Sequence, residues 1–372
     1  MTDHDWRDAR NVLCVRLDAL GDVLMSTPAI RALKESVPGR KVTLLTSTSG
    51  AAVARMVPEL DDVIVYEAPW MKSSGAQAAL PERAAADLEM IESLRAGSFD
   101  AAVIFTVYSQ NPLPAALFCH LAGIPRRLAY CRENPYALLT DWAKEEEPER
   151  FVRHEVQRQL DLVATLGCSA RDERMSLVVS DAARESVRAK LAVRGVDLSA
   201  PWLVAHPGAT APSRRYPPEL FAEAARLLAL ENGEQVVFSG GASERELVDE
   251  IRHAMVEPSF TVAGELDLAE LVALLAEAPL LVSNNTGPVH IAAATGTPVV
   301  DIYALTNPQH TPWRVPARVL SHDVPCRYCY RSVCPQGHHD CLRLVTPESV
   351  ARAAGELLSA RPERAGAAME LS

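Results

Sequence analysis

The sequence predicts an α/β protein built from two doubly wound domains. Its 372 residues exceed what a single hydrophobic core usually supports, so two domains of ordinary size are expected. In each half, apolar segments of strand length alternate with segments whose apolar residues recur at helical spacing. The pattern of strand, glycine turn and helix begins afresh near residue 200. This alternation is typical of parallel sheets that helices cover on both faces.

The first half contains four segments that read as strands. An apolar strand, a short turn and a helix open the chain, and a helix that begins near His154 closes this half. Residues 71–86 lack a steady period and contain Ser-Ser-Gly and a proline, which predicts that they form or adjoin a mobile loop. The strands are expected at 12–17, 41–47, 61–67 and 99–106.

The second half repeats the first in kind. We place the boundary between residues 175 and 200 and divide the chain into domains 1–180 and 181–372, the second with a Cys-rich segment at 326–341 and a C-terminal helix. Ligand turns are expected where its strands end. These strands are expected at 201–209, 235–241, 279–285 and 297–304.

Composition and charge exclude several classes of protein. The formal net charge of -11 argues against nucleic-acid binding, which relies on Lys and Arg to neutralise phosphates. No apolar run approaches the roughly 18 to 20 residues of a membrane helix, and the N-terminus is polar and acidic. We expect a cytoplasmic protein. Peripheral contact with the inner face of the plasma membrane stays open, because docking requires only one apolar face.

An acidic residue follows the first strand. The turn Leu17-Asp18-Ala19-Leu20-Gly21-Asp22 places Asp22 at the start of a helix, where a ligand crevice normally opens in a doubly wound sheet. Asp22 is there a candidate general base. The alternative is that Asp22 caps the helix, because Asp is a favoured cap residue. The turn lacks G-x-G-x-x-G, which disfavours a dinucleotide cofactor.

Three turns of the second domain are candidates for binding an anionic ligand. In 283–290, Thr286 and Gly287 can donate hydrogen bonds to a diphosphate at a helix N-terminus, although a capped helix without ligand would look the same. His290 is either a pyrophosphate donor or a buried core histidine. After the 206–209 turn, an arginine pair is either a phosphate clamp or a solvated surface pair. In 239–244, Glu244 can accept hydrogen bonds from ribose hydroxyls or serve as a first-turn helix acid.

Together these turns define a predicted site for a diphosphate-bearing ligand, here named the donor site. Most of its residues follow strands of the second domain, and Gly21 belongs to the first turn of the first domain. The donor-binding residues are predicted to be Gly21, Arg214, Arg215, Gly241, Glu244, Asn285, Thr286, Gly287, Pro288 and His290.

A group of arginines and a group of cysteines lie outside these turns. Arg126, Arg127 and Arg132 can hold phosphates of a second ligand, the acceptor, or they form an exposed basic cluster. Four cysteines packed into 326–341 allow a structural metal site, although their gaps match no common zinc finger or ribbon; disulfides and free thiols are the alternatives. We assign no metal to catalysis. The four cysteines are Cys326, Cys329, Cys334 and Cys341.

In combination and order, several motifs resemble the ADP-heptose:lipopolysaccharide heptosyltransferase family, also called glycosyltransferase family 9. They are VLCVRLDALGDVLMSTPAIRAL, HPGATAPSRRYP, FSGGASERE, VSNNTGPVHIAAATGTPVV and CRYCYRSVCPQGHHDC, and the match runs from about Val12 to Val350. The resemblance implies a GT-B fold, in which two Rossmann-like doubly wound domains face a central cleft. It also implies an inverting mechanism without a required cofactor.

The resemblance also assigns roles to residues. It maps the catalytic base onto Asp22 and a phosphate-binding residue onto Arg214, and it places Glu244 near the ribose. Thr286, Gly287 and His290 fall in the donor-diphosphate motif. One departure is Asn285, where many relatives have aspartate.

The expected reaction moves heptose from ADP-heptose onto a lipopolysaccharide-core or similar glycan acceptor. The expected partners are therefore an ADP-sugar and a glycolipid or glycan. The alternatives are a nucleotide-sugar epimerase and a noncatalytic nucleotide-sugar-binding protein.

Overall fold

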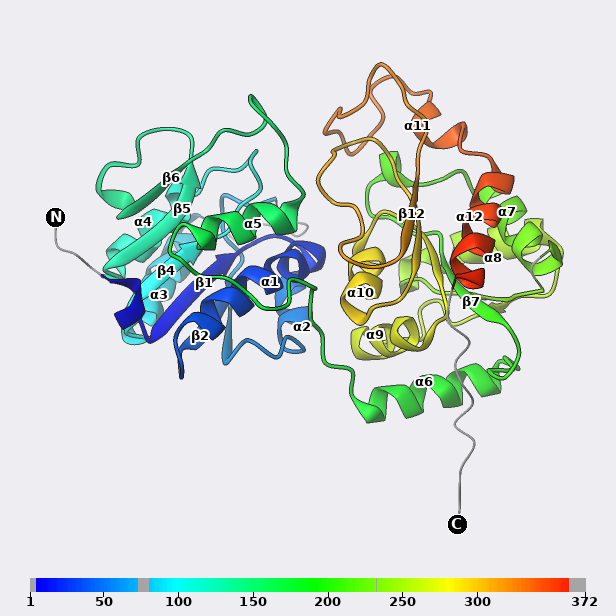
Figure 1. Ribbon diagram of the computed structural model, residues 1–372, viewed down its shortest axis with the longest axis horizontal. Coiled ribbons are helices and arrows are strands. Elements are labelled where there is room, and N and C mark those ends of the chain that lie inside the picture. Colours follow the sequence, from blue (N-terminus) through cyan, green and yellow to red (C-terminus); the bar gives the residue numbers. More distant parts are fainter. Residues whose placement is uncertain (1–4, 73–79, 232, 361–372) are drawn as a thin grey trace, which may run out of the picture. The chain divides into compact units, whose positions relative to one another are not determined.

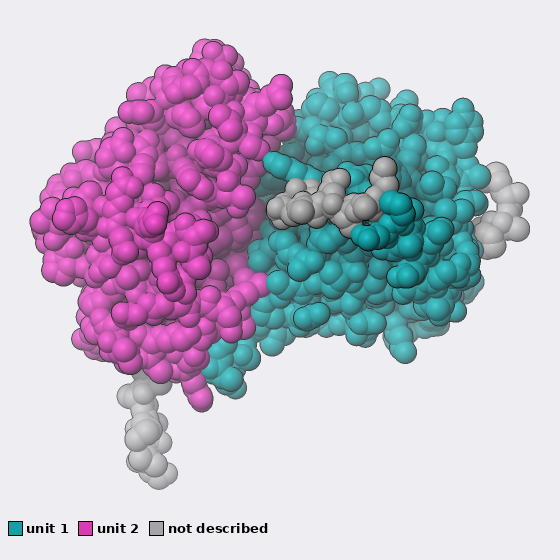
Figure 2. Space-filling view, turned by 180° about the vertical axis from the view of Figure 1, so that it is seen from behind, with its two compact units in different colours: residues 1–183, 293–295, 308–314 teal, residues 184–292, 296–307, 315–372 magenta. Residues whose placement is uncertain are grey.

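Two six-stranded parallel sheets form the framework of the chain (Figure 1). The computed structural model describes residues 5–72, 80–231 and 233–360. The chain divides into two units, which Figure 2 colours separately. Unit 1 contains residues 1–183, 293–295 and 308–314, and unit 2 contains the rest.

The sheet of unit 1 has the strand order β3-β2-β1-β4-β5-β6, and every neighbouring pair is parallel. This is the Rossmann order, in which the chain reverses direction across the sheet between β1 and β4. The strands are β1 (Asn11–Arg16), β2 (Lys41–Thr46), β3 (Asp62–Val65), β4 (Ala101–Ile104), β5 (Arg126–Cys131) and β6 (Asp141–Lys144). The helices are α1 (Leu20–Ser36), α2 (Thr48–Ala54), α3 (Leu80–Ala96), α4 (Leu113–Leu121) and α5 (Glu155–Ala164).

Alternation along β1 explains why this sheet is covered on both faces. Leu13 and Val15 belong to one apolar cluster with residues of α3 and α4. Val12 and Cys14 alternate with them, point to the opposite face, and are also fully buried. α1 packs against α2 and α5. A central strand buried on both faces must be apolar throughout, so a charged residue at its end requires partners.

The sheet of unit 2 repeats this topology with the order β12-β11-β10-β7-β8-β9, again entirely parallel. Its reversal point lies between β7 and β10. The strands are β7 (Trp202–His206), β8 (Gln235–Phe238), β9 (Phe260–Thr261), β10 (Leu281–Asn284), β11 (Val299–Ile302) and β12 (Ala317–Leu320). The helices are α6 (Asp181–Val193), α7 (Pro218–Glu231), α8 (Arg245–Met255), α9 (Leu268–Glu277), α10 (Gly287–Thr295), α11 (Asp340–Arg343) and α12 (Pro347–Ser359).

The two sheets confirm the prediction of two doubly wound, Rossmann-like domains, and the eight predicted strands are all present. The sequence analysis missed β5, β6, β9 and β12. Of residues 71–86, which were predicted to form or adjoin a loop, residues 80–86 open α3, while residues 73–79 lie outside the described part of the chain. None of the described helices combines the length and apolar character needed to cross a bilayer.

Candidate active site

Asp22 lies in the first turn of α1, directly after β1 and the turn that follows it. The N-cap of this helix is Ala19, and Asp22 does not cap it. Its Oδ1 atom instead accepts a hydrogen bond from Nη2 of Arg16 at 3.1 Å. Its side chain keeps 20% of its surface exposed. Because β1 borders the reversal point of the sheet, Asp22 lies where doubly wound proteins bind their ligands.

Arg16 ends β1, and its guanidinium is fully buried among three carboxylates. Nε lies 2.9 Å from Oδ2 of Asp18, and Nη1 lies 2.8 Å from Oε1 of Glu155. Burial alone would lower the pKa of Arg16, but the attraction of Asp18, Glu155 and Asp22 outweighs burial and raises it. Arg16 is therefore a permanent cation behind Asp22.

The two other carboxylates around Arg16 are less accessible than Asp22. Burial raises the pKa of Glu155, and the charge of Asp22 raises it further, whereas Arg16 and Arg158 oppose this shift. Burial also raises the pKa of Asp18, against the attraction of Arg16. Three acids thus share one guanidinium, and among them Asp22 has the most exposed side chain.

In unit 2, the turns after β7, β8 and β10 are joined by hydrogen bonds. Nδ2 of Asn284, at the end of β10, donates to the carbonyl of Pro207 after β7 at 2.7 Å. The main-chain N–H of Tyr216 donates to Oδ1 of Asn284 at 3.0 Å. Nδ1 of His206 lies 3.0 Å from Oγ of Ser239 after β8. Since β7 and β10 flank the reversal point, three predicted ligand turns meet at the ligand-binding edge of this sheet.

Glu244 lies against the turn that follows β7. Its Oε2 accepts a hydrogen bond from the main-chain N–H of Gly241 at 2.7 Å and lies 3.8 Å from Nε2 of His206. A Cβ atom at Gly208 would be only 1.9 Å from Oε1 of Glu244, so only glycine allows this approach. Burial lowers the pKa of His206 despite the opposing charge of Glu244. Glu244 is therefore held as a local cap, and its carboxylate lies at the edge where the turns meet.

The turn after β10 carries Asn285, Thr286 and the start of α10 at Gly287. Nδ2 of Asn285 donates to Oδ2 of Asp301 on β11 at 2.9 Å. Burial raises the pKa of Asp301 to about 8, against the attraction of Asn285 and Arg214. Among the residues that the structure describes, Oγ1 of Thr286 is buried without a hydrogen-bond partner. Such an atom fits a site where a ligand supplies the missing partner.

The remaining predicted donor residues lie beside this turn or in the first domain. Pro288 and His290 are buried in α10. Arg214 is half-buried at the end of a short helix, 212–214, and it attracts Asp301. Arg215 is exposed, and its Nε donates to the carbonyl of Ala209 at 2.7 Å. Gly21 belongs to α1 in unit 1.

The three arginines predicted for the acceptor differ in their surroundings. Arg126 and Arg127 begin β5 rather than a surface loop. Arg127 is buried, and its guanidinium donates to the carbonyls of Ile124, Ala137 and Leu138. Arg132 is exposed and lies 3.7 Å from a carboxylate oxygen of Glu149. They therefore do not form the exposed basic cluster that was the alternative interpretation.

The four cysteines of 326–341 are half-buried free thiols. Sγ of Cys326 lies 3.6 Å from Nε2 of His338. Burial raises the pKa of Cys341, with smaller contributions from the other three cysteines. In the part of the chain that the structure describes, no three histidine, cysteine or acidic side chains are grouped so that they could hold a metal ion.

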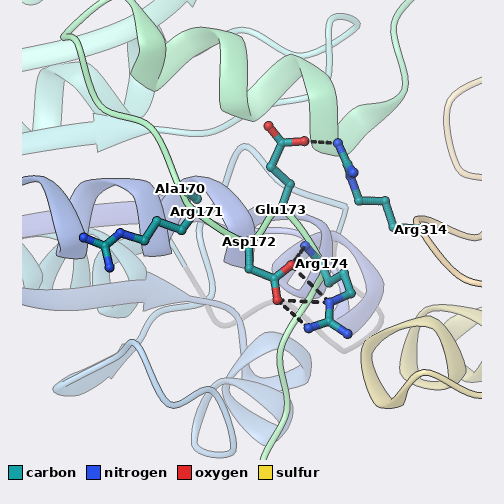
Figure 3. Close-up of a pocket in the computed structure, with 6 residues that line it drawn as sticks. All are labelled: Ala170, Arg171, Asp172, Glu173, Arg174 and Arg314. Carbon is teal, nitrogen blue, oxygen red and sulfur yellow. Dashed lines mark hydrogen bonds and ion pairs between the residues drawn. The ribbon is translucent and has the colours of Figure 1, made fainter.

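A separate hollow of about 490 Å³ lies in unit 1 (Figure 3). It is lined by Ala170, Arg171 and two ion pairs, Arg174 with Asp172 and Arg314 with Glu173. None of the predicted site residues lines it. Because each acid of the hollow is paired with an arginine, we do not assign a ligand to it.

The sequence patterns do not identify three residues that lie around Asp22 or beside the turn after β10. Arg16, Glu155 and Asp301 were each treated as part of an ordinary strand or helix. A signal was present for two of them, because Arg16 directly follows the apolar run of β1 and Asp301 interrupts that of β11. A charge in such a strand is buried and must have a partner. Glu155 carries no comparable signal, since acids are common in the first turn of a helix.

Comparison with known proteins identifies the family. The sequence profile of glycosyltransferase family 9 (heptosyltransferase) matches residues 88–339. The chain is 27% identical over 358 residues to lipopolysaccharide heptosyltransferase 2 of Salmonella typhimurium, which covers 94% of this chain and 98% of the relative. It is also 27% identical over 360 residues to the enzyme of the same name from Escherichia coli strain K12, with 93% and 98% covered.

Solved structures agree on the fold. ADP-heptose lps heptosyltransferase II of E. coli has a TM-score of 0.72 at 24% identity and covers 94% of this chain and 98% of its own. The glycosyl transferase family 9 protein of Veillonella parvula DSM 2008 has a TM-score of 0.76 at 20% identity, with 94% and 97% covered. These likenesses confirm the GT-B type of fold, and the family match favours a transferase over an epimerase or a noncatalytic binding protein. The chain is a glycosyltransferase and belongs to glycosyltransferase family 9, the heptosyltransferase family.

Proposed function

We propose that this glycosyltransferase moves heptose from ADP-heptose onto a lipopolysaccharide-core or similar glycan acceptor, with inversion at the anomeric carbon. The observation that carries the proposal is the partly exposed Asp22 carboxylate, which a buried arginine holds at the reversal point of the first sheet. The similarity to lipopolysaccharide heptosyltransferases over nearly the whole chain supports heptose as the transferred sugar.

The proposed reaction is a single displacement. Asp22 takes the proton of an acceptor hydroxyl while the oxygen of that hydroxyl attacks the anomeric carbon of the donor. The bond between that carbon and the phosphate oxygen breaks, and ADP leaves from the opposite face.

The donor site of the proposal lies in unit 2. Negative charge grows on the departing diphosphate, and Arg214 together with the N–H groups of Thr286 and Gly287 would stabilise it. The buried hydroxyl of Thr286 supports this assignment. Glu244 is assigned to the ribose hydroxyls, since its carboxylate lies at the edge where three ligand turns meet. Arg215, Gly241, Asn285, Pro288 and His290 complete the proposed donor site of unit 2, and the predicted donor residue Gly21 lies in unit 1.

The acceptor side is assigned from unit 1. We infer that Arg132, which follows β5 at the same end of the sheet as Asp22, contacts anionic groups of the acceptor. Arg126 begins β5 at the opposite end of the sheet, and Arg127 holds the main chain of its own segment, so neither is assigned to the acceptor. A glycolipid acceptor would bring the enzyme to the inner face of the plasma membrane from the cytoplasm. The proposed reaction has no metal in it. A structural metal at the four cysteines stays a prediction, which metal analysis of the purified protein would test.

The test is a transfer assay with ADP-heptose and a heptose-acceptor lipopolysaccharide core. We expect ADP release that depends on the acceptor and a product with inverted anomeric configuration by NMR. Donor incubated alone is the control. Conversion of the donor to an epimer without acceptor would contradict the proposal, and so would donor binding without transfer to any core acceptor.

A further inference from the structure

Arg16, at the end of β1, contacts three carboxylates. Its guanidinium is fully buried, and its three nitrogen atoms each contact a different carboxylate. One of these is Asp22, the base of the proposed reaction, and the rest of this inference depends on that proposed function. We propose that Arg16 is the positioning residue of Asp22 and that Glu155 anchors Arg16 from behind.

The anchoring is visible in the contacts of Glu155. Oε1 accepts hydrogen bonds from Nη1 of Arg16 at 2.8 Å and from Nε2 of Gln159 at 2.7 Å. The main chain of Glu155 donates to the carbonyl of Gln309 at 3.0 Å, and Nε2 of Gln309 lies 3.4 Å from Oε2. All these groups are buried. These contacts hold Arg16 against α5, where its Nη2 donates a hydrogen bond to Asp22.

The contact fixes the orientation of the base. Nη2 of Arg16 donates a hydrogen bond to Oδ1 of Asp22. Among the described residues, none donates to Oδ2 of Asp22. An oxygen without a protein donor is the one that can take a proton from an acceptor hydroxyl. Holding a reacting group in one orientation lowers the activation barrier, and a displacement of about 1 Å can cost on the order of 100-fold in rate.

One cation faces three carboxylates in this cluster. Arg16 contacts Glu155 and Asp18 as well as Asp22, so carboxylates outnumber the guanidinium. Asp18 also accepts a hydrogen bond from Gln110. On the other side of Glu155, Arg158 pairs with Glu145 and Glu147. Neutralising Glu155 therefore removes a like charge near Asp22.

Two substitutions test the two parts of this proposal. Arg16→Lys replaces a three-nitrogen fork by one ammonium, which cannot contact three separate carboxylates. We expect kcat to fall about 10- to 100-fold, with the donor KM within about twofold of wild type. Glu155→Gln keeps an oxygen that accepts from Arg16 and removes one negative charge. We expect the acid limb of the kcat/KM pH profile to move to lower pH by about one unit, because a like charge near the base is lost.

Arg40→Lys is the matched control. Arg40 is also a buried arginine of unit 1, but its guanidinium donates to the carbonyls of Trp6, Ala9 and Leu33 and to the Ser36 hydroxyl. We expect Arg40→Lys to lower Tm while kcat and the pH profile stay at wild-type values. A purely structural role for Arg16 would give the same result for Arg16→Lys.

The outcomes separate this inference from the proposed function. If Asp22→Asn is inactive but Glu155→Gln leaves the acid limb in place, this inference fails and the proposed base stands. If Asp22→Asn keeps its activity, the proposed function fails first. Should Arg16→Lys not fold, the pH profile of Glu155→Gln alone decides: a shifted limb supports the anchor, and an unshifted limb overturns it.

Discussion

Gly208 offers a way to move Glu244 without changing its chemistry. A Cβ atom added at Gly208 would lie 1.9 Å from Oε1, 2.2 Å from Cδ and 2.5 Å from Oε2 of Glu244. Non-bonded carbon and oxygen atoms require more than about 3 Å, so the carboxylate must shift by roughly 1 Å or more. The methyl group of Gly208→Ala therefore displaces the group that we assign to the ribose.

The size of the effect follows from the contacts that Glu244 would lose. The main one is the 2.7 Å hydrogen bond from the N–H of Gly241. A hydrogen bond to a charged group contributes about 1.5 to 3 kcal/mol, and the 21% exposure of the side chain reduces this to about 1 to 2 kcal/mol. That free energy contributes to folding. If the displaced carboxylate also loses a ribose hydrogen bond of similar strength, ADP should bind about tenfold more weakly.

The assay is calorimetric titration of ADP into wild type, Gly208→Ala, Glu244→Ala and the double variant. In the Glu244→Ala background the carboxylate is absent and the new methyl group has room. Gly208→Ala should therefore not weaken ADP binding further in that background. This non-additivity identifies Glu244 as the route of the effect. If Gly208→Ala weakens ADP binding by the same factor in both backgrounds, Glu244 does not transmit it and the ribose assignment loses its support.

Two further predictions concern the same unit. Arg214→Ala should weaken ADP binding and lower kcat, each by about 10- to 100-fold, because a cation is lost beside the departing diphosphate; unchanged kinetics would show that Arg214 is not the clamp. Asp301→Asn should change the pH dependence of stability. Burial raises the pKa of Asp301 from 3.8 to about 8, so the folded state of wild type loses stability as pH rises from about 4 to 8, by up to about 1.4 kcal/mol per pH unit. Urea unfolding should show that the free energy of unfolding of the variant, relative to that of wild type, is higher at pH 8 than at pH 5. An equal difference at both pH values would contradict a titrating Asp301.

The sequence predicted the eight strands that are apolar throughout or end in a glycine or polar turn. The four missed strands lack that signature for physical reasons. β5 begins with two arginines, and β6 alternates between exposed and half-buried residues at a sheet edge. β9 has only two residues, and β12 is a largely exposed edge strand. Edge strands bury less apolar surface, so their hydrophobic pattern is weak.

The candidate site was predictable where residues follow strands and not where they meet from distant parts of the chain. Asp22, Glu244 and Thr286 all follow predicted strands, and topology places such turns at the ligand edge. The pairing of Arg16 with Glu155 joins residues 139 positions apart. Only the packing of α5 against α1 brings these residues together, and no local pattern encodes it.

The substitution Asp22→Asn tests the proposed chemistry most directly, with turnover and ADP affinity measured on the same preparation. The amide keeps the shape of the side chain and an oxygen for Arg16, but it cannot take a proton. We predict a fall in kcat of about 100- to 10,000-fold, while ADP binds within about twofold of wild type. A variant that still transfers heptose at close to the wild-type rate would show that another group removes the proton.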